Sequence, residues 1–123
     1  MLHESNGSRK LLIKQRSDIG ALLVDQIQSR IGSDYRVKII RERPWASITF
    51  SGTRHNISIT GSVSNDIEFL SSFATQLQEY NFHLPGHFVA DLVANIPYMP
   101  PPDHLALEIL TIKDHVASYD RSV

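Results

Sequence analysis

The stretch PWASITFSGTRHNISITG, residues 44–61, decides the fold because it predicts a β-hairpin together with its register. Gly52 and Thr53 are typical of a two-residue loop in which the glycine takes a positive φ angle. Counting outward from that loop places Phe50 opposite His55 and gathers the apolar residues of both arms on one face. We therefore expect a sheet with one face on a core and a hydroxyl-rich face open to water or to a partner.

The residues that precede this stretch predict a further strand on the same apolar face. Residues 35–41 alternate between apolar and polar side chains, which is typical of a half-buried strand. A short turn at Glu42–Arg43 would then lead into Pro44, a residue that suits the beginning of a strand. Both predicted turns agree on which side chains face the core, so the sequence predicts three consecutive antiparallel strands.

The remaining elements are predicted from apolar spacing and from residues that end helices. Apolar residues at three- and four-residue steps indicate helices over residues 18–31 and 66–80, and Gly32 is a suitable stop for the first of them. Alternation predicts a fourth strand over residues 87–96. A run that is apolar on both sides predicts a fifth strand over residues 105–113, either central in the sheet or covered on its back face.

These elements predict a single α+β domain over residues 1–123, in the order α-β-β-β-α-β-β. Short connections favour a mostly antiparallel five-stranded sheet with two helices on one face. A chain of this length can bury one core without disulfides or metals. Residues 1–10 are expected to form a loose lead-in, and residues 114–123 a polar tail.

Composition excludes several classes of function. The chain has no cysteine, which removes disulfides and thiol nucleophiles and suits a reducing cytosol. Twelve basic and thirteen acidic residues give a net charge of −1, so no global field attracts nucleic acid or an anionic membrane. No stretch has the pattern of a membrane span, a signal peptide, a phosphate-binding glycine loop or a nucleophile elbow. We therefore expect a cytoplasmic protein that uses no cofactor and does not contact membranes.

The six histidines are the first candidates for chemistry. His83, His87 and Asp91 have the four-residue spacing of metal ligands on a helix, but residues 85–86 are Pro-Gly, so we expect no metal site. His55 lies on the predicted apolar face, where it is either a satisfied core-edge residue or a general base. The enzyme hypothesis is a hydrolytic or isomerising site with His55 or His87 as the base and Asp91 as the group that orients it.

The predicted open face is the second candidate. Its hydroxyl-rich surface, with Ile40 opposite Trp45 as an apolar anchor, favours a non-catalytic interaction module that forms a homodimer through this face. A plainly solvated sheet and a nucleic-acid-binding surface are the alternatives, and the balanced charge disfavours nucleic acid. The expected interface residues are Trp45, Ile40, Ser47, Thr49, Asn56 and Ser58. The candidate anion-binding residues are Arg54, Arg36 and Lys38.

The segments PWASITFSGTRH and LPGHFVADLVA resemble small bacterial proteins of uncharacterised function, which pair a Pro-Trp-Ala-Ser strand and a Gly-x-Arg-His turn with a later Gly-His-x-Val-Ala-Asp strand. The resemblance covers about a quarter of the chain and implies a bacterial, cytosolic setting without an assigned activity. The α-β-β-β-α portion also resembles the order of double-stranded RNA-binding domains. Its second predicted helix begins with the acidic SNDIEFL, where that module is rich in lysine.

Overall fold

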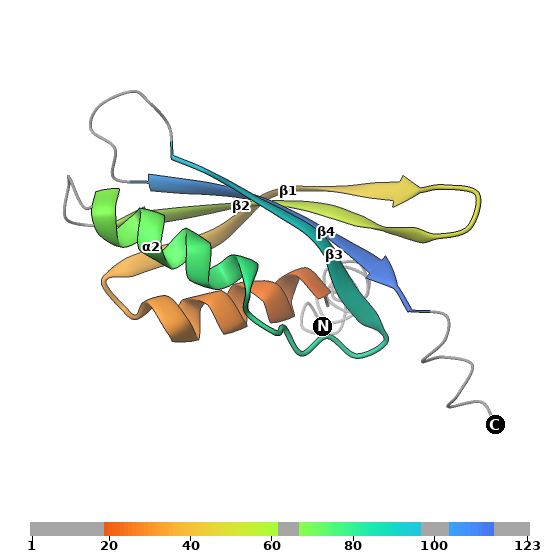
Figure 1. Ribbon diagram of the computed structural model, residues 1–123, viewed down its shortest axis with the longest axis horizontal. Helices are drawn as coiled ribbons and strands as arrows, with labels where there is room; N and C mark the ends of the chain where they lie inside the picture. Colours follow the sequence, from red (N-terminus) through yellow and green to blue (C-terminus); the bar gives the residue numbers. More distant parts are fainter. Residues whose placement is uncertain (1–18, 62–66, 97–103, 115–123) are drawn as a thin grey trace, which may run out of the picture.

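The computed structural model describes residues 19–61, 67–96 and 104–114, in which two helices pack on one face of a four-stranded antiparallel sheet (Figure 1). The first helix covers residues 19–31. The other elements are β1 (Tyr35–Ala46), β2 (Ser51–Gly61), α2 (Ile67–Gln78), β3 (His87–Asn95) and β4 (His104–Lys113). The strands lie in the order β1-β2-β4-β3.

The topology consists of two units that each contain a helix followed by a β-hairpin. The second strands of the two units, β2 and β4, pair at the centre of the sheet, and β1 and β3 form its edges. Both helices lie on the same side of the sheet (Figure 1). Only two strands separate the helices, so the chain lacks the strand order of double-stranded RNA-binding domains. The described helices and strands leave the opposite side of the sheet uncovered.

The predicted hairpin turns are both wrong. β1 continues through Glu42 and Arg43 without a turn, so the described sheet has four strands rather than five. The chain reverses at residues 47–50, where the Ser47 N–H donates to the carbonyl oxygen of Phe50 at 2.7 Å. The Phe50 N–H donates to Ser47 Oγ at 3.0 Å. A serine that closes a four-residue loop therefore replaces the expected glycine turn.

Gly52 has a different role from the one predicted. It lies within β2 opposite Ile112 of β4, and a Cβ atom at this position would collide with the carbonyl oxygen of Thr111. The glycine is thus required by the close approach of a neighbouring strand and not by a positive φ angle. Local sequence cannot separate these two uses of glycine, which explains the wrong turn.

A β-bulge restores the predicted division into two faces. His55 lies opposite Glu42 rather than Phe50, and the register of β1 shifts between Ile39 and Arg41, which leaves Ile40 without a ladder partner. The extra residue shifts the alternation of β1 by one position. Before the bulge, the odd-numbered residues of β1 face the core, and after it they face the other side. Trp45, which pairs with Gly52, therefore lies on the open face.

The core lies between the helices and the sheet, as the apolar patterns predict. Gly32 ends the first helix with a φ angle of 93°, in agreement with its predicted role. β4 has buried residues on both faces and is a central strand, which is one of the two alternatives predicted from its apolar pattern. The fully buried apolar side chains are Leu23, Ile27, Ile57, Ile59, Leu70, Leu77, Leu105, Leu107 and Ile109. The expectations for residues 1–10 and 115–123 lie outside the described residues.

Candidate functional site

The sheet face opposite the helices presents its side chains in rows that cross the strands. Side chains of directly paired residues point to the same face, so the strand registers define each row. From one end to the other, the rows are Arg36, Thr60 and His104; Lys38, Ser58, Ala106 and Asn95; Arg41, Asn56, Glu108 and Val93; Arg43, Arg54, Leu110 and Asp91; Trp45, Gly52, Ile112 and Phe88. We call this surface the open face.

Basic side chains follow the β1 edge of the open face. Its four exposed cations, which we call the cationic column, are Arg36, Lys38, Arg41 and Arg43. None of them forms an ion pair with another residue that the structure describes. Arg54 on β2 differs, because its Nη1 lies 3.3 Å from Oε2 of Glu108. Positive charge along β1 is therefore not neutralised within the described part of the chain.

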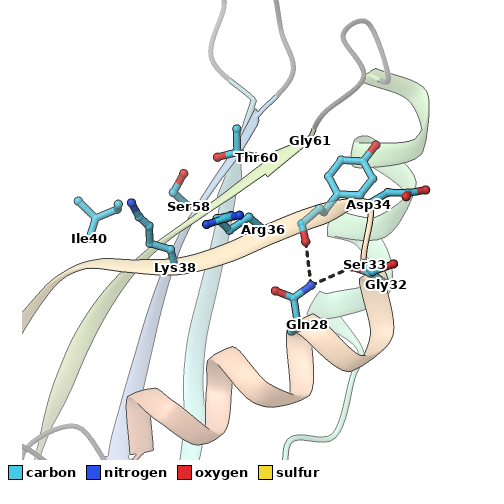
Figure 2. Close-up of a pocket in the computed structure, with 11 residues that line it drawn as sticks. Gln28, Gly32, Ser33, Asp34, Arg36, Lys38, Ile40, Ser58, Thr60 and Gly61 are labelled. Atoms are coloured by element: carbon cyan, nitrogen blue, oxygen red, sulfur yellow. Dashed lines mark hydrogen bonds between the residues drawn. The ribbon is translucent and has the colours of Figure 1, made fainter.

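A hollow of about 930 Å³ lies where β1 begins, at the Arg36 end of the open face. Arg36 and Lys38 line it together with Ser58 and Thr60, and Figure 2 shows these four side chains on the same side of the sheet. Asp34 contributes an acidic group to the lining. The hollow therefore combines cations with hydroxyl groups, which can contact an anionic ligand.

Gln28 fixes the wall of this hollow. Its Nε2 donates to the carbonyl oxygens of Gly32 and Tyr35, both at 2.8 Å (Figure 2). Its Oε1 accepts from the N–H of Val37 at 3.1 Å. One side chain thus ties the end of the first helix to the first residues of β1. These three hydrogen bonds hold the beginning of β1, where the cationic column starts, against the first helix.

The other end of the open face carries its largest apolar side chains. Trp45 is half-buried, Leu110 and Ile112 are buried, and Phe88 is 42% exposed. Val93, one row before the Asp91 row and on the same edge strand, is 49% exposed. Arg43, Arg54 and Asp91 share the row of Leu110, so this end combines charged groups with the aromatic and aliphatic side chains that are typical of protein interfaces.

The structure separates the interface residues predicted from the sequence. Trp45, Asn56 and Ser58 lie on the open face. Ser47 and Thr49 belong to the loop over residues 47–50 and therefore lie outside the sheet rows. Ile40 is the 62% exposed residue of the bulge. The predicted pairing of Ile40 with Trp45 is wrong, because both residues belong to β1.

The opposite side of the sheet holds a buried polar network around His55. The Nδ1 atom lies 2.8 Å from Oε2 of Glu42, and Nε2 lies 2.8 Å from Oγ1 of Thr111. A carboxylate only accepts hydrogen bonds, so we assign the proton to Nδ1, and Nε2 then accepts from the threonine hydroxyl. Gly20 of the first helix covers the network so closely that a Cβ atom there would collide with the Glu42 carboxylate.

Burial determines the charge of this histidine. Removal from water lowers the pKa of His55 below its ordinary value of 6.5, and the charge of nearby His87 acts in the same direction. The hydrogen bond and the negative charge of Glu42 oppose this change without reversing it. His55 is therefore neutral at pH 7, in agreement with the assigned tautomer.

The network has the hydrogen-bond direction of a hydroxyl, histidine and carboxylate triad, but it is closed to substrates. Thr111 and His55 each expose 1% of their surface. A nucleophile must approach the reacting atom directly, and this hydroxyl meets only protein atoms. The arrangement therefore satisfies buried polar groups and fixes the register between β1, β2 and β4.

The remaining predicted catalytic residues do not complete a site with His55, although the charge of His87 acts on it. Asp91 pairs with Leu110 on the open face, whereas His55 pairs with Ile109 and points to the core. His87 lies at the start of β3, and its Nδ1 donates to the carbonyl oxygen of Pro85 at 2.9 Å. Within the described ranges, no three histidine or acidic side chains form a group that could hold a metal ion.

Sequence reasoning missed Glu42 and Thr111. Glu42 was expected in a turn, and Thr111 lies in a strand whose pattern indicates only burial. Contact between His55 and Thr111 joins residues that are 56 positions apart in the chain. Thr111, which lies between Leu110 and Ile112 in the mainly apolar run LALEILTIK, is the one local signal that a buried partner exists.

No protein-family model matches the chain, and searches of curated proteins and of solved structures gave no match. The resemblance to small bacterial proteins therefore stays a prediction. No helix in the described part of the chain has both the length and the apolar character of a membrane span. Inferences about function accordingly depend on the open face and on the buried network.

Proposed function

We propose that the chain is a non-catalytic interaction module that pairs with a second copy of itself through the open face. The observation that carries this proposal is the apolar end of that face, where Phe88 and Val93 are exposed beside the buried Leu110 and Ile112. Exposed apolar side chains on both sides of Asp91 along one edge strand favour a contact surface. The network of His55, Glu42 and Thr111, in contrast, lies on the helix-facing side, where His55 and Thr111 are buried.

Charge determines which part of the open face can contact the same face of a second subunit. A symmetric contact centred on β1 would bring the cationic column of one subunit against that of the other, and like charges in contact cost several kcal/mol. A contact centred on β3 and β4 places the two columns at opposite outer edges. Such a contact would also cover the β3 edge, which carries only Asp91 as a charged residue between Phe88 and Val93.

The proposal is tested by sedimentation velocity over 1–100 micromolar protein, a range of about two decades around the affinities of moderate dimers. We expect a reversible dimer in the wild type and at least a tenfold weaker one in Val93→Glu. Ile67→Glu is the matched control, because Ile67 is 44% exposed at the beginning of α2 and lies outside the open face. A monomeric wild type, or equal dissociation constants for the two variants, would contradict the proposal.

A further inference from the structure

The cationic column forms a second surface, which the proposed dimer leaves free. Arg36, Lys38, Arg41 and Arg43 point to one face of an edge strand and are all exposed. Side chains on one face of a strand recur about every 7 Å. This repeat is comparable to the distance between successive phosphates of an extended single strand of nucleic acid, so each cation can meet a separate phosphate.

Polar side chains on the neighbouring strand complete this surface. Thr60, Ser58 and Asn56 lie directly opposite Arg36, Lys38 and Arg41 in the ladder. Hydroxyl and amide groups bind phosphate oxygens, sugar hydroxyls and base edges. The hollow at the Arg36 end provides space for one end of a ligand.

Apolar side chains are interspersed with the cations. Ile40 is 62% exposed between Lys38 and Arg41, on the side to which Arg36 and Lys38 point. Trp45 follows Arg43 at the end of the column and is half-buried. An indole is a stacking platform for a base, and each stacked base contributes about 1–3 kcal/mol. A ligand that carries charge alone would gain nothing from these two residues.

We infer that the surface from Arg36 to Trp45 binds single-stranded nucleic acid, with phosphates along the cationic column and bases against Ile40 and Trp45. A single line of cations about 23 Å long matches one backbone, whereas a duplex would present two. The net charge of −1 does not oppose this binding, because the strand face concentrates cations that the whole chain balances elsewhere. Three acidic groups lie on this side of the molecule: Asp91 is on β3, Glu108 is paired with Arg54, and Asp34 lines only the hollow at the Arg36 end.

The tryptophan provides a direct test, because Trp45 is the only one in the chain. Wild-type protein is titrated with a ten-nucleotide single-stranded oligonucleotide of mixed sequence, and both tryptophan fluorescence and the anisotropy of a labelled oligonucleotide are recorded. We expect quenching of Trp45 together with an affinity that falls as salt is raised. Heparin and polyglutamate, which carry charge without bases, should leave the fluorescence unchanged.

Two single charge reversals locate the site. Lys38→Glu should weaken binding at least tenfold and reduce the salt dependence by about one counterion. Lys113→Glu makes the same change in net charge at the far end of β4, where the side chain is exposed outside the open face, and should change the affinity less than twofold. Equal effects of the two variants would overturn the inference.

Other results would also overturn it. These are the absence of salt-dependent binding at low salt, stronger binding of a duplex than of the single strand, and binding of polyglutamate in preference to the oligonucleotide. The last result would assign the surface to an acidic protein instead. Repeating the titration with Val93→Glu separates this inference from the proposed dimer, since loss of the dimer should leave binding to the cationic column intact.

Discussion

Glu42 and His55 lie directly opposite each other in the β1–β2 ladder, and their side chains meet at 2.8 Å on the helix-facing side of the sheet. The contact exists only because the bulge at Ile40 turns Glu42 toward the core. His55 is completed by Thr111 on its other side, so three strands contribute to one network. This network connects the shape of β1 to the stability of the whole sheet.

Removal of the carboxylate should destabilise the protein. Glu42→Ala leaves the Nδ1–H of a buried imidazole without its acceptor, and we expect the free energy of unfolding to fall by about 2 kcal/mol. Glu42→Gln retains an acceptor oxygen and should lose less. Urea unfolding monitored by circular dichroism gives both values. Glu79→Ala, which removes an exposed carboxylate just after α2, is the control and should stay within about 0.5 kcal/mol of the wild type.

The pH dependence of stability should report on His55. Because burial lowers the pKa of His55 in the folded state, the unfolded chain binds more protons between that lowered pKa and about 6.5. The contribution of His55 to the free energy of unfolding is therefore fully present above pH 6.5 and is lost as the pH falls through that window.

The measurement compares the free energy of unfolding of the wild type and of His55→Gln between pH 8 and pH 5. We expect the difference between the two proteins to decrease as the medium becomes more acidic, since glutamine does not titrate. A difference that stays constant with pH would mean that His55 binds protons equally in the folded and unfolded states.

The bulge itself can be tested by deletion. Deleting Ile40 leaves the pairs Ile39–Ile57 and Arg41–Asn56 on either side intact, so a regular ladder replaces the bulge and we expect a loss below about 1 kcal/mol. Deleting Asn56 from the central strand instead shifts His55 or Ile57 to the wrong face of the sheet. Thermal unfolding should show the second deletion to be severely destabilised or unfolded. Similar losses in both variants would contradict the register described here.

The sequence was sufficient to predict those parts of the fold in which buried residues recur with the period of a helix or a strand. The stripes of both helices, the stop at Gly32, and the alternation of His55, Ile57 and Ile59 with polar neighbours all identify the correct core face. The turn predicted at Gly52–Thr53 was wrong because Gly52 is required by contact with Thr111, far away in the sequence. The bulge at Ile40 has no local signal either, because an extra residue is recognised only against its partner strand.

The candidate site was partly predictable for the same reason. Arg36, Lys38, Asn56 and Ser58 alternate within continuous strands, so their common face follows from the period of the strand. Arg41 and Arg43 join them only through the bulge, and the cationic column could not be recognised without it. Partners of His55 could not be predicted, because both hydrogen bonds cross between strands whose register was unknown.

Substitution of the tryptophan separates the two proposed surfaces. Trp45 lies on β1, at the margin of a dimer contact centred on β3 and β4, but within the surface inferred to bind nucleic acid. Trp45→Ala should therefore weaken self-association only a few fold, less than Val93→Glu does, since truncations at an interface rim cost little.

The same substitution should reduce affinity for a single-stranded oligonucleotide about tenfold or more, because one stacked base is lost. Trp45→Phe keeps an aromatic ring and should recover most of that affinity. Sedimentation velocity and oligonucleotide anisotropy on the same preparations provide the comparison, and a Trp45→Ala variant that loses the dimer yet binds the oligonucleotide normally would contradict both assignments.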